Sequence, residues 1–237
     1  MKKFGMVQGI AYYIGSDIQT AEHAHHALEL VFALDKPFNL TTKEKTFKNV
    51  YGIIVKPNIA HRFIGRKSDY LFIFLEPELL QARQILDHFP MSSPGVRELP
   101  PIDGPPGERE IFNFNFLKST LGIPVNTTPA KKIDDPRLEK ITAFITDNLG
   151  AGKIKSGELA ARIHLSESRF LHLFKEKLNL PVRKYILWLR LQKALMFISR
   201  GADFTESTHK AGFSDSAHFS RTFFKMFGVT PSSLFKR

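Results

Sequence analysis

Two stretches near the C-terminal end repeat one pattern: Leu159-Ala160-Ala161-Arg162-Ile163-His164-Leu165-Ser166 and Ser207-Thr208-His209-Lys210-Ala211-Gly212-Phe213-Ser214-Asp215. The copies are offset by 48 residues before the turn and by 49 after it, because the second turn carries one extra residue. Each copy is typical of a short helix, a turn and a second helix, whose apolar stripe begins at Phe170 or Phe219. The repeat therefore predicts two helix-turn-helix units, which would let one chain enter two successive major grooves of DNA.

The first unit is predicted to contain a helix over 156–163 and a capping residue, Ser166, at the start of the second helix. On that second helix, Phe170, Leu173 and Phe174 form the predicted core stripe. The opposite face is the predicted DNA-contacting surface, made of Ser168, Arg169, Leu171, His172 and Lys175. A leucine on an outer face needs an apolar partner, and a thymine methyl group or another protein surface would serve.

The second unit repeats this arrangement. Its predicted cap is Asp215 or Ser214, and its predicted core residues are Phe219, Phe223 and Phe227. The outer face, again predicted to contact DNA, carries Ser216, Ala217, Ser220, Arg221 and Lys225. Arg221 is the best candidate for a bidentate contact with guanine, and a phosphate contact or a salt bridge within the domain is the alternative.

The segment between the units predicts one long helix from Val182 to Ser199, opened by Pro181 and followed by Gly201. Its 18 residues would span about 27 Å. Successive major grooves lie about 34 Å apart, so a rod of this length suits the spacing of two recognition helices. Upstream, Asp135-Pro136 predicts the start of a further helix, with Asp135 as its cap.

The positive charge is unevenly distributed along the chain, whose net charge is +11. Residues 129–237 contain 20 Lys and Arg against 10 Asp and Glu, whereas residues 1–128 contain 14 against 13. The excess therefore lies in the half that carries the repeat, as a phosphate-binding surface requires. The alternative is that these basic residues only keep a helical domain soluble.

Composition excludes several classes of protein. The chain has 237 residues, enough for one large or two ordinary domains, and its 43% hydrophobic residues argue against disorder. Cysteine is absent, which excludes disulfides and a thiol nucleophile. No apolar run approaches the roughly 20 residues that span a bilayer, and no signal peptide is evident at Met1. The expected location is the cytoplasm, without membrane association.

The N-terminal half is predicted to be rich in β-strands, at 7–14, 28–34, 51–55, 61–64 and 70–75. Several short strands at this spacing favour an antiparallel barrel or sandwich. Helices are expected at 78–88 and at 110–121, although Phe112, Phe114 and Phe116 also alternate as in a strand. The proline-rich stretch 90–106 is predicted to be a surface loop.

Three histidines in this half are candidate metal ligands. His23, His25 and Glu29 have the spacing of a first cupin motif, and His61 lies where a second motif would supply a third histidine. The second motif departs from the cupin pattern, because its spacing is one residue short and its glycine is missing. We therefore predict no metal and no cofactor, and keep His23, His25 and His61 as candidates. If these histidines bind no metal, they would pair across strands or line a pocket.

The C-terminal part resembles the AraC/XylS family of transcription regulators. The resemblance covers about residues 135–235 and is most specific over Gly212–Pro231, with Arg190 and Ala194 matching in the connecting segment. It implies a two-unit DNA-binding domain, often preceded by a cupin-like domain that binds an effector or dimerises. Two departures concern Ser207 and Thr208, which stand where the family has apolar residues and should be buried with hydroxyls that need partners. A third is Asn179, which stands where glycine is usual.

These observations predict two domains. Residues 1–128 would form a mainly-β, cupin-like barrel with added helices for effector binding or dimerisation, 129–134 a linker, and 135–237 an all-α DNA-binding domain with two helix-turn-helix units. The predicted function is a sequence-specific DNA-binding transcription regulator. Its expected partners are double-stranded DNA, a small-molecule effector, a second copy of the chain and RNA polymerase. Two alternatives stay open: a metal-dependent cupin enzyme with a DNA-binding appendage, and an architectural protein that binds DNA without sequence choice.

Overall fold

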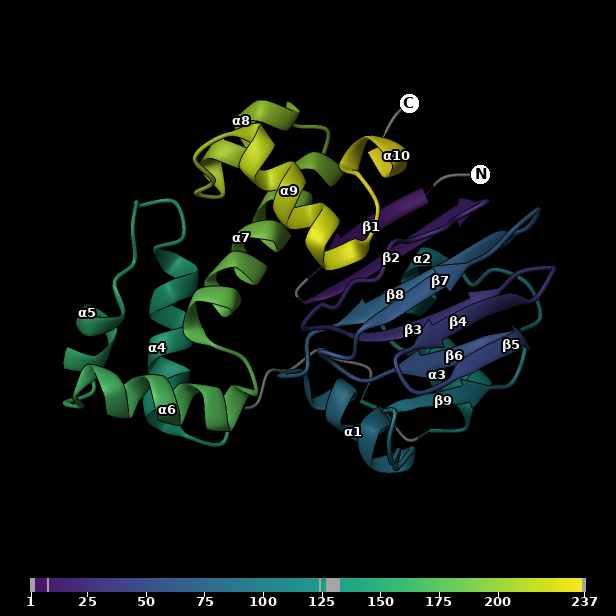
Figure 1. Ribbon diagram of the computed structural model, residues 1–237, viewed down its shortest axis with the longest axis horizontal. Helices are drawn as coiled ribbons and strands as arrows, with labels where there is room; N and C mark the ends of the chain where they lie inside the picture. Colours follow the sequence, from purple (N-terminus) through teal and green to yellow (C-terminus); the bar gives the residue numbers. More distant parts are fainter. Residues whose placement is uncertain (1–2, 8, 124, 127–132, 236–237) are drawn as a thin grey trace. The chain divides into compact units, whose positions relative to one another are not determined.

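The computed structural model describes residues 3–7, 9–123, 125–126 and 133–235 (Figure 1). Contacts divide the chain into two compact units, one formed by Met1–Lys131 with Phe223–Arg237 and the other by Lys132–Thr222. Most of the predicted linker, 129–134, lies outside the described residues. The predicted domain limits stay predictions. No helix in the described ranges is long and apolar enough to cross a membrane.

The first unit contains two antiparallel sheets. The larger sheet has six strands in the order β1 (Lys3–Val7), β2 (Ile10–Ser16), β8 (Asp69–Leu75), β3 (Leu28–Ala33), β6 (Gly52–Val55) and β9 (Val96–Leu99). The smaller sheet has the order β5 (Thr46–Val50), β4 (Phe38–Thr42) and β7 (His61–Ile64). The mainly-β prediction is confirmed. Among the described residues the strands form two sheets and do not close into one barrel.

The larger sheet is covered on both faces, which explains why every residue of β3 is buried. Successive side chains of a strand point to opposite faces. Leu28, Leu30 and Phe32 therefore enter a core with three helices, α1 (Leu80–His88), α2 (Glu108–Phe112) and α3 (Asn115–Leu121). Val31 and Ala33 enter a second core shared with Phe38, Leu40 and Phe63 of the smaller sheet.

The sequence missed several elements of this unit. The five predicted strands correspond to β2, β3, β6, β7 and β8, but β1, β4 and β5 were not predicted. The prediction that 90–106 is all loop was wrong, because Val96–Leu99 pairs with β6 at the edge of the larger sheet. The predicted helix over 110–121 is broken into α2 and α3 at Phe114, whose φ is 60°.

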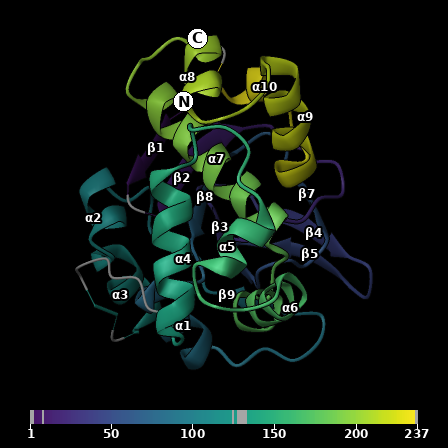
Figure 2. The ribbon, with the colours of Figure 1, turned by 90° about the vertical axis from the view of Figure 1, so that its left-hand side faces the viewer.

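The second unit is helical. It contains α4 (Pro136–Asp147), α5 (Ser156–Ala161), α6 (Glu167–Leu178), α7 (Val182–Ser199), α8 (Phe204–Lys210) and the first part of α9 (Ser216–Phe227) (Figure 2). The end of α9 and α10 (Pro231–Phe235) are assigned by contacts to the first unit. The predicted helix Val182–Ser199 is confirmed as α7. Asp135 caps α4 as predicted, because its carboxylate accepts a hydrogen bond from the Arg137 amide at 2.9 Å.

Candidate nucleic-acid interface and a buried histidine cluster

The first helix-turn-helix unit consists of α5 and α6. The turn between them is closed by the amide of Leu165, which donates to the carbonyl of Ala160 at 3.0 Å. The chain reverses at His164, which takes a left-handed conformation with φ 55°. Ser166 then caps α6 as predicted, its hydroxyl oxygen accepting from the Arg169 amide at 3.3 Å. These contacts set the angle at which α6 leaves the turn.

One face of α6 is buried and the other is free. Phe170, Leu173 and Phe174 are buried, as predicted, and the Phe174 ring lies 5.4 Å from the Tyr185 ring of α7. The five predicted DNA-contacting residues of this helix are all exposed: Ser168, Arg169, Leu171, His172 and Lys175. Leu171 is 39% exposed, so this leucine does face solvent. Contact of these residues with DNA stays a prediction.

The second helix-turn-helix unit, α8 and α9, reproduces the same turn. The Phe213 amide donates to the Thr208 carbonyl at 3.1 Å, and the left-handed residue is Gly212, with φ 91°. The cap is Asp215, whose carboxylate accepts from the His218 amide at 2.6 Å. That backbone hydrogen bond, followed by one from the Ser214 hydroxyl, lowers the pKa of Asp215. Asp215 therefore stays ionised near neutral pH, and its negative charge offsets the partial positive charge at the N-terminus of α9.

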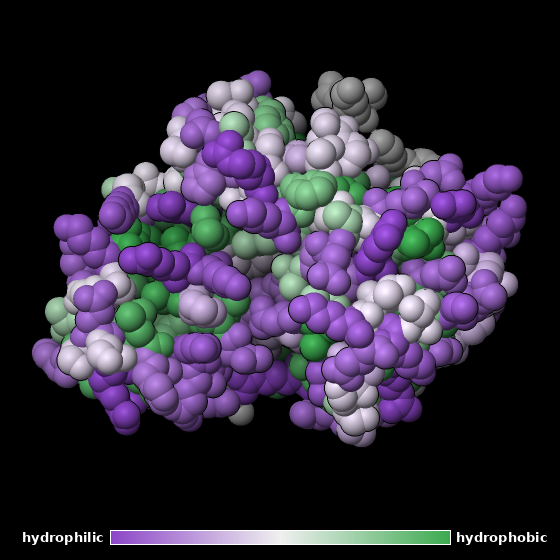
Figure 3. All heavy atoms as spheres, in the orientation of Figure 1, coloured by the Kyte–Doolittle hydropathy of each residue, from purple (hydrophilic) through white to green (hydrophobic). Residues whose placement is uncertain are grey.

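The core face of α9 is aromatic. Phe219 is fully buried, with its ring 5.2 Å from that of Phe204 and 5.3 Å from that of Phe213. Phe223 is also buried, whereas the predicted core residue Phe227 is only half-buried. Of the predicted DNA-contacting residues, Ala217, Arg221 and Lys225 are exposed and Ser216 and Ser220 are half-buried. Hydrophilic residues cover much of the face seen in Figure 3.

Ser207 and Thr208 are buried and their hydroxyls have hydrogen-bond partners, as expected from the sequence. Both are 0% exposed. The Ser207 hydroxyl donates to the Asp203 carbonyl at 2.6 Å, and the Thr208 hydroxyl donates to the Thr205 carbonyl at 2.8 Å. Because both hydroxyls are satisfied inside α8, the helix carries polar residues at buried positions without leaving unpaired groups.

Arg190 connects two parts of the helical unit. Its guanidinium donates from Nη2 to the Gly152 carbonyl at 2.7 Å, which joins α7 to the loop after α4. Burial lowers the pKa of Arg190. The side chain is thus used inside the helical unit.

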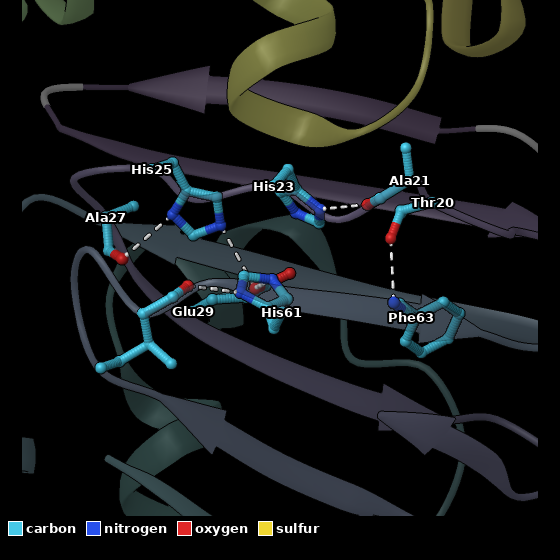
Figure 4. Close-up of polar contacts among 9 residues, drawn as sticks. Thr20, Ala21, His23, His25, Ala27, Glu29, His61 and Phe63 are labelled. Carbon is cyan, nitrogen blue, oxygen red and sulfur yellow. Dashed lines mark hydrogen bonds and ion pairs between the residues drawn. The ribbon is translucent and has the colours of Figure 1, made fainter. Parts of the chain in front are cut away.

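A separate cluster of ionisable side chains lies in the first unit (Figure 4). His23 and His25 precede β3, Glu29 lies in β3 and His61 begins β7, and all four residues are buried. One nitrogen or oxygen from each lies within 4.8 Å of all the others. The three histidines singled out in the sequence are therefore brought together. Glu29, which shared their motif but was not proposed as a ligand, completes the group.

The orientation of each imidazole is set by the backbone. Nδ1 of His23 lies 3.0 Å from the Ala21 carbonyl, and Nδ1 of His25 lies 3.2 Å from that of Ala27. Nδ1 of His61 lies 2.9 Å from the Ile59 carbonyl in the same way. A carbonyl oxygen can only accept, so each Nδ1 carries a proton. The three Nε2 atoms are left for contacts within the cluster.

Glu29 and His61 favour each other's charged form within the cluster. Burial raises the pKa of Glu29, but His61 and the hydrogen bond from His25 outweigh it and hold that pKa well below its usual range. Burial lowers the pKa of His61, but Glu29, whose Oε2 lies 2.9 Å from Nε2, raises it above its usual value. Burial and the two neighbouring histidines lower the pKa of His23 to about 3. The Glu29 carboxylate thus pairs with two of the three imidazoles, those of His25 and His61.

Aromatic rings and a second pair border the cluster. The His25 ring lies 5.4 Å from the Phe74 ring and 5.8 Å from the Phe227 ring. His26 lies outside the cluster, with Nε2 2.7 Å from Oε1 of Glu78. Two adjacent histidines in the sequence therefore have different partners, which the spacing alone did not predict.

Comparison with known proteins identifies the C-terminal part. Residues 159–237 match the family described as a helix-turn-helix domain. The Msm operon regulatory protein of Streptococcus mutans is 30% identical over 84 residues, which cover 35% of this chain and 30% of that protein. The arabinose operon regulatory protein of Escherichia coli is 29% identical over 99 residues, covering 41% of this chain and 34% of that protein. The matched part thus spans between 30% and 42% of the first three relatives.

Solved structures show the fold over most of the chain. The unsaturated fatty acid-bound ToxT of Vibrio cholerae superimposes with a TM-score of 0.60 at 12% identity, covering 94% of this chain and 93% of that one. Another ToxT structure gives a TM-score of 0.58 at 10% identity, covering 95% and 96%. The chain therefore has a ToxT-like fold, with a sheet-rich N-terminal part, and carries in residues 159–237 a helix-turn-helix domain of the AraC type.

Proposed function

We propose that this protein is a sequence-specific DNA-binding transcription regulator controlled through its N-terminal unit. The observation that carries the proposal is the repeated helix-turn-helix geometry. Both turns are closed by the same hydrogen bond, and both second helices leave a polar face exposed in the half of the chain with the basic excess. Such helices fit the major groove, where side chains contact base edges.

We propose different roles for the exposed faces of α6 and α9 in binding DNA. Arg169 and Lys175 on α6 are suited to phosphates, because their charges require no particular base. On α9, exposed Arg221 is flanked by small residues that allow close approach to a base pair. We propose that Arg221 makes a bidentate contact with guanine and that Leu171 contacts an apolar group, such as a thymine methyl.

The N-terminal unit is proposed to bind a small effector or to dimerise. ToxT, which shares the fold, has been solved with an unsaturated fatty acid bound. Here residues 1–128 carry almost no net charge, so they have little electrostatic reason to contact DNA. Dimerisation would place two DNA-binding domains on one operator and raise affinity through effective concentration. RNA polymerase is a proposed partner of the DNA-bound protein, which would act where the DNA is, in the cytoplasm.

The test is selection of duplexes from a random pool by the full chain, followed by affinity measurements at several salt concentrations. We expect one enriched sequence and an affinity that falls steeply with salt, because bound phosphates release counterions. The double variant Arg169→Ala with Lys175→Ala should bind more weakly and less salt-dependently. Lys118→Ala, an exposed lysine of the first unit, is the matched control. Equal affinity for unrelated duplexes would favour the architectural alternative, and absence of binding would overturn the proposal.

A metal-dependent enzyme is the second candidate function, and the histidine cluster is the observation that favours it. His23, His25, Glu29 and His61 lie within reach of one ion. The curated relatives named above are regulators, which favours the first proposal. Turnover of a substrate by metal-loaded full-length protein, lost in His61→Gln, would favour the enzyme.

A further inference from the structure

The histidine cluster joins the two sheets of the first unit. Glu29 belongs to β3 of the larger sheet, and His61 belongs to β7 of the smaller sheet. His23 forms an isolated backbone bridge with His61, with amide-to-carbonyl distances of 3.0 and 2.9 Å in the two directions. The cluster therefore contains one residue from each sheet, and a bond between Glu29 and His61 through a shared ion would hold the two sheets together.

The three histidines are oriented in the way that is usual for metal ligands. The Nδ1–H of each one donates a hydrogen bond to a backbone carbonyl, at 3.0, 3.2 and 2.9 Å for His23, His25 and His61. Histidines that bind metals use their second nitrogen in this way, which sets the tautomer and orients the ring. Figure 4 shows the three imidazoles and the Glu29 carboxylate drawn together in one place. The hydrogen bonds that would orient the three histidines around a metal ion are therefore present.

Without an ion the cluster is poorly satisfied. His61 Nε2 is fully buried and makes no well-directed hydrogen bond, although Glu29 Oε2 is 2.9 Å away. Because Nδ1 of His61 donates to the Ile59 carbonyl, Nε2 is the atom that faces the cluster. The rings of His23 and His25 lie beside it, with centroids 4.2 and 5.4 Å from that of His61. A divalent cation would accept an electron pair from each of the four side chains.

The distances fit a small tetrahedral ion. Zinc binds histidine nitrogen and carboxylate oxygen at about 2.0–2.2 Å, which separates neighbouring ligands of a tetrahedron by about 3.3 Å. Glu29 Oε2 already lies 2.9 Å from His61 Nε2 and 3.2 Å from His25 Nε2. The remaining pairs lie within 4.8 Å, so small rotations would close the set. Three nitrogens and one oxygen favour a first-row transition ion over magnesium or calcium, which prefer oxygen.

We propose that His23, His25, Glu29 and His61 bind one divalent transition-metal ion of the zinc class and that this ion links the two sheets of the first unit. The inference revises the sequence-based prediction of no metal. Four protein ligands fill a tetrahedral ion and leave no position for a substrate, so this inference favours a structural or regulatory role over the enzyme candidate named above. It does not rest on the proposed DNA-binding function.

The first test uses full-length protein stripped with a chelator and then titrated with Zn²⁺ or Co²⁺. We expect one ion per chain by equilibrium dialysis, the visible absorption of tetrahedral cobalt, and a rise in Tm. With free Zn²⁺ at about 100 times Kd, the rise should be about 5 °C or more. Mg²⁺ should produce no rise. Wild-type protein that takes up no Zn²⁺ or Co²⁺ would overturn the proposal whatever the variants do.

The second test assigns the ligands. Glu29→Gln and His61→Gln keep the size of the side chain or nearly so, and each should weaken Co²⁺ binding by more than about 100-fold, beyond the loss seen when only an outer partner is removed. His26→Gln is the matched control, because His26 is equally buried but pairs with Glu78. Circular dichroism of the metal-free variants checks folding. Unchanged cobalt binding in folded Glu29→Gln and His61→Gln would contradict the proposal, and so would equal loss in His26→Gln.

Discussion

The two helix-turn-helix units share a backbone turn but differ in what surrounds it. The amide of Leu165 reaches the Ala160 carbonyl at 3.0 Å, and that of Phe213 reaches Thr208 at 3.1 Å. The left-handed residue of the first turn is His164, and its counterpart in the second is Gly212, with φ values of 55° and 91°. One backbone geometry is thus built with two different residue types.

The reason for glycine in the second turn is space. A Cβ on Gly212 would lie 2.2 Å from the Leu149 carbonyl oxygen and 2.8 Å from Nε of Arg190. The first turn is exposed at His164, so a large side chain can extend into solvent there. The left-handed conformation alone therefore does not demand glycine; close approach of another backbone does.

The buried positions before the turns differ in the same instructive way. Leu159 and Ala160 in the first unit correspond to Ser207 and Thr208 in the second, and all four are buried. The apolar pair gains from burial directly. The hydroxyls of Ser207 and Thr208 donate to backbone carbonyls at the start of their own helix, so polar side chains can be buried at positions that are apolar in the first unit.

Gly212→Ala should give the largest effect, a loss of about 3 kcal/mol or more in the free energy of unfolding, since backbone strain and overlap add. Gly201→Ala is the control, because Gly201 also has a positive φ, 85°, but nothing within 4 Å of the added Cβ. It should lose only about 1 kcal/mol. Urea unfolding followed by the fluorescence of Trp188, the single tryptophan, measures both. Equal losses would show that overlap at Gly212 is unimportant.

Arg221→Ala should weaken binding to the selected duplex by about 1–3 kcal/mol and relax preference at one base pair. Its counterpart in the first unit is His172, so His172→Ala should change base preference less. Affinities for the selected duplex and its single-base variants, at fixed salt, test this asymmetry. A uniform loss on all sequences, with a salt slope smaller by about one, would identify Arg221 as a phosphate contact instead.

Ser207→Ala should change the free energy of unfolding by less than about 1 kcal/mol. The Asp203 carbonyl keeps a partner when the hydroxyl is removed, because it also accepts from the Ser207 amide at 2.9 Å. The Trp188 unfolding curve measures this too. A loss above about 2 kcal/mol would mean that the hydroxyl has a role in the second unit beyond satisfying itself.

Asn179→Gly should give the smallest effect, a gain of at most about 0.5 kcal/mol. Asn179 ends α6 in the left-handed conformation, with φ 50°, where glycine costs less strain but loses more freedom on folding. Its counterpart after α9 is Gly228, with φ 67°. A clear loss of stability on the same urea curve would show that the asparagine side chain itself is needed at the end of α6.

Local signals in the sequence predicted most of the helical half. Asp135, Ser166 and Asp215 cap the helices expected of them, and Val182–Ser199 forms one helix. Caps and apolar stripes act within a few residues, so spacing alone reveals them. The strands β5 and β9 were missed because each buries only two side chains and depends on pairing with a distant strand.

The order of residues alone reveals the double motif, the charge asymmetry between the two halves and the spacing of His23, His25 and Glu29. Only the folded chain shows that His61 meets Glu29 across two sheets and that Gly212 lies against the Leu149 carbonyl. Helices form from contacts between near neighbours in the chain, which periodicity records. Contacts between distant segments depend on how whole elements pack, and no local pattern in the sequence contains that information.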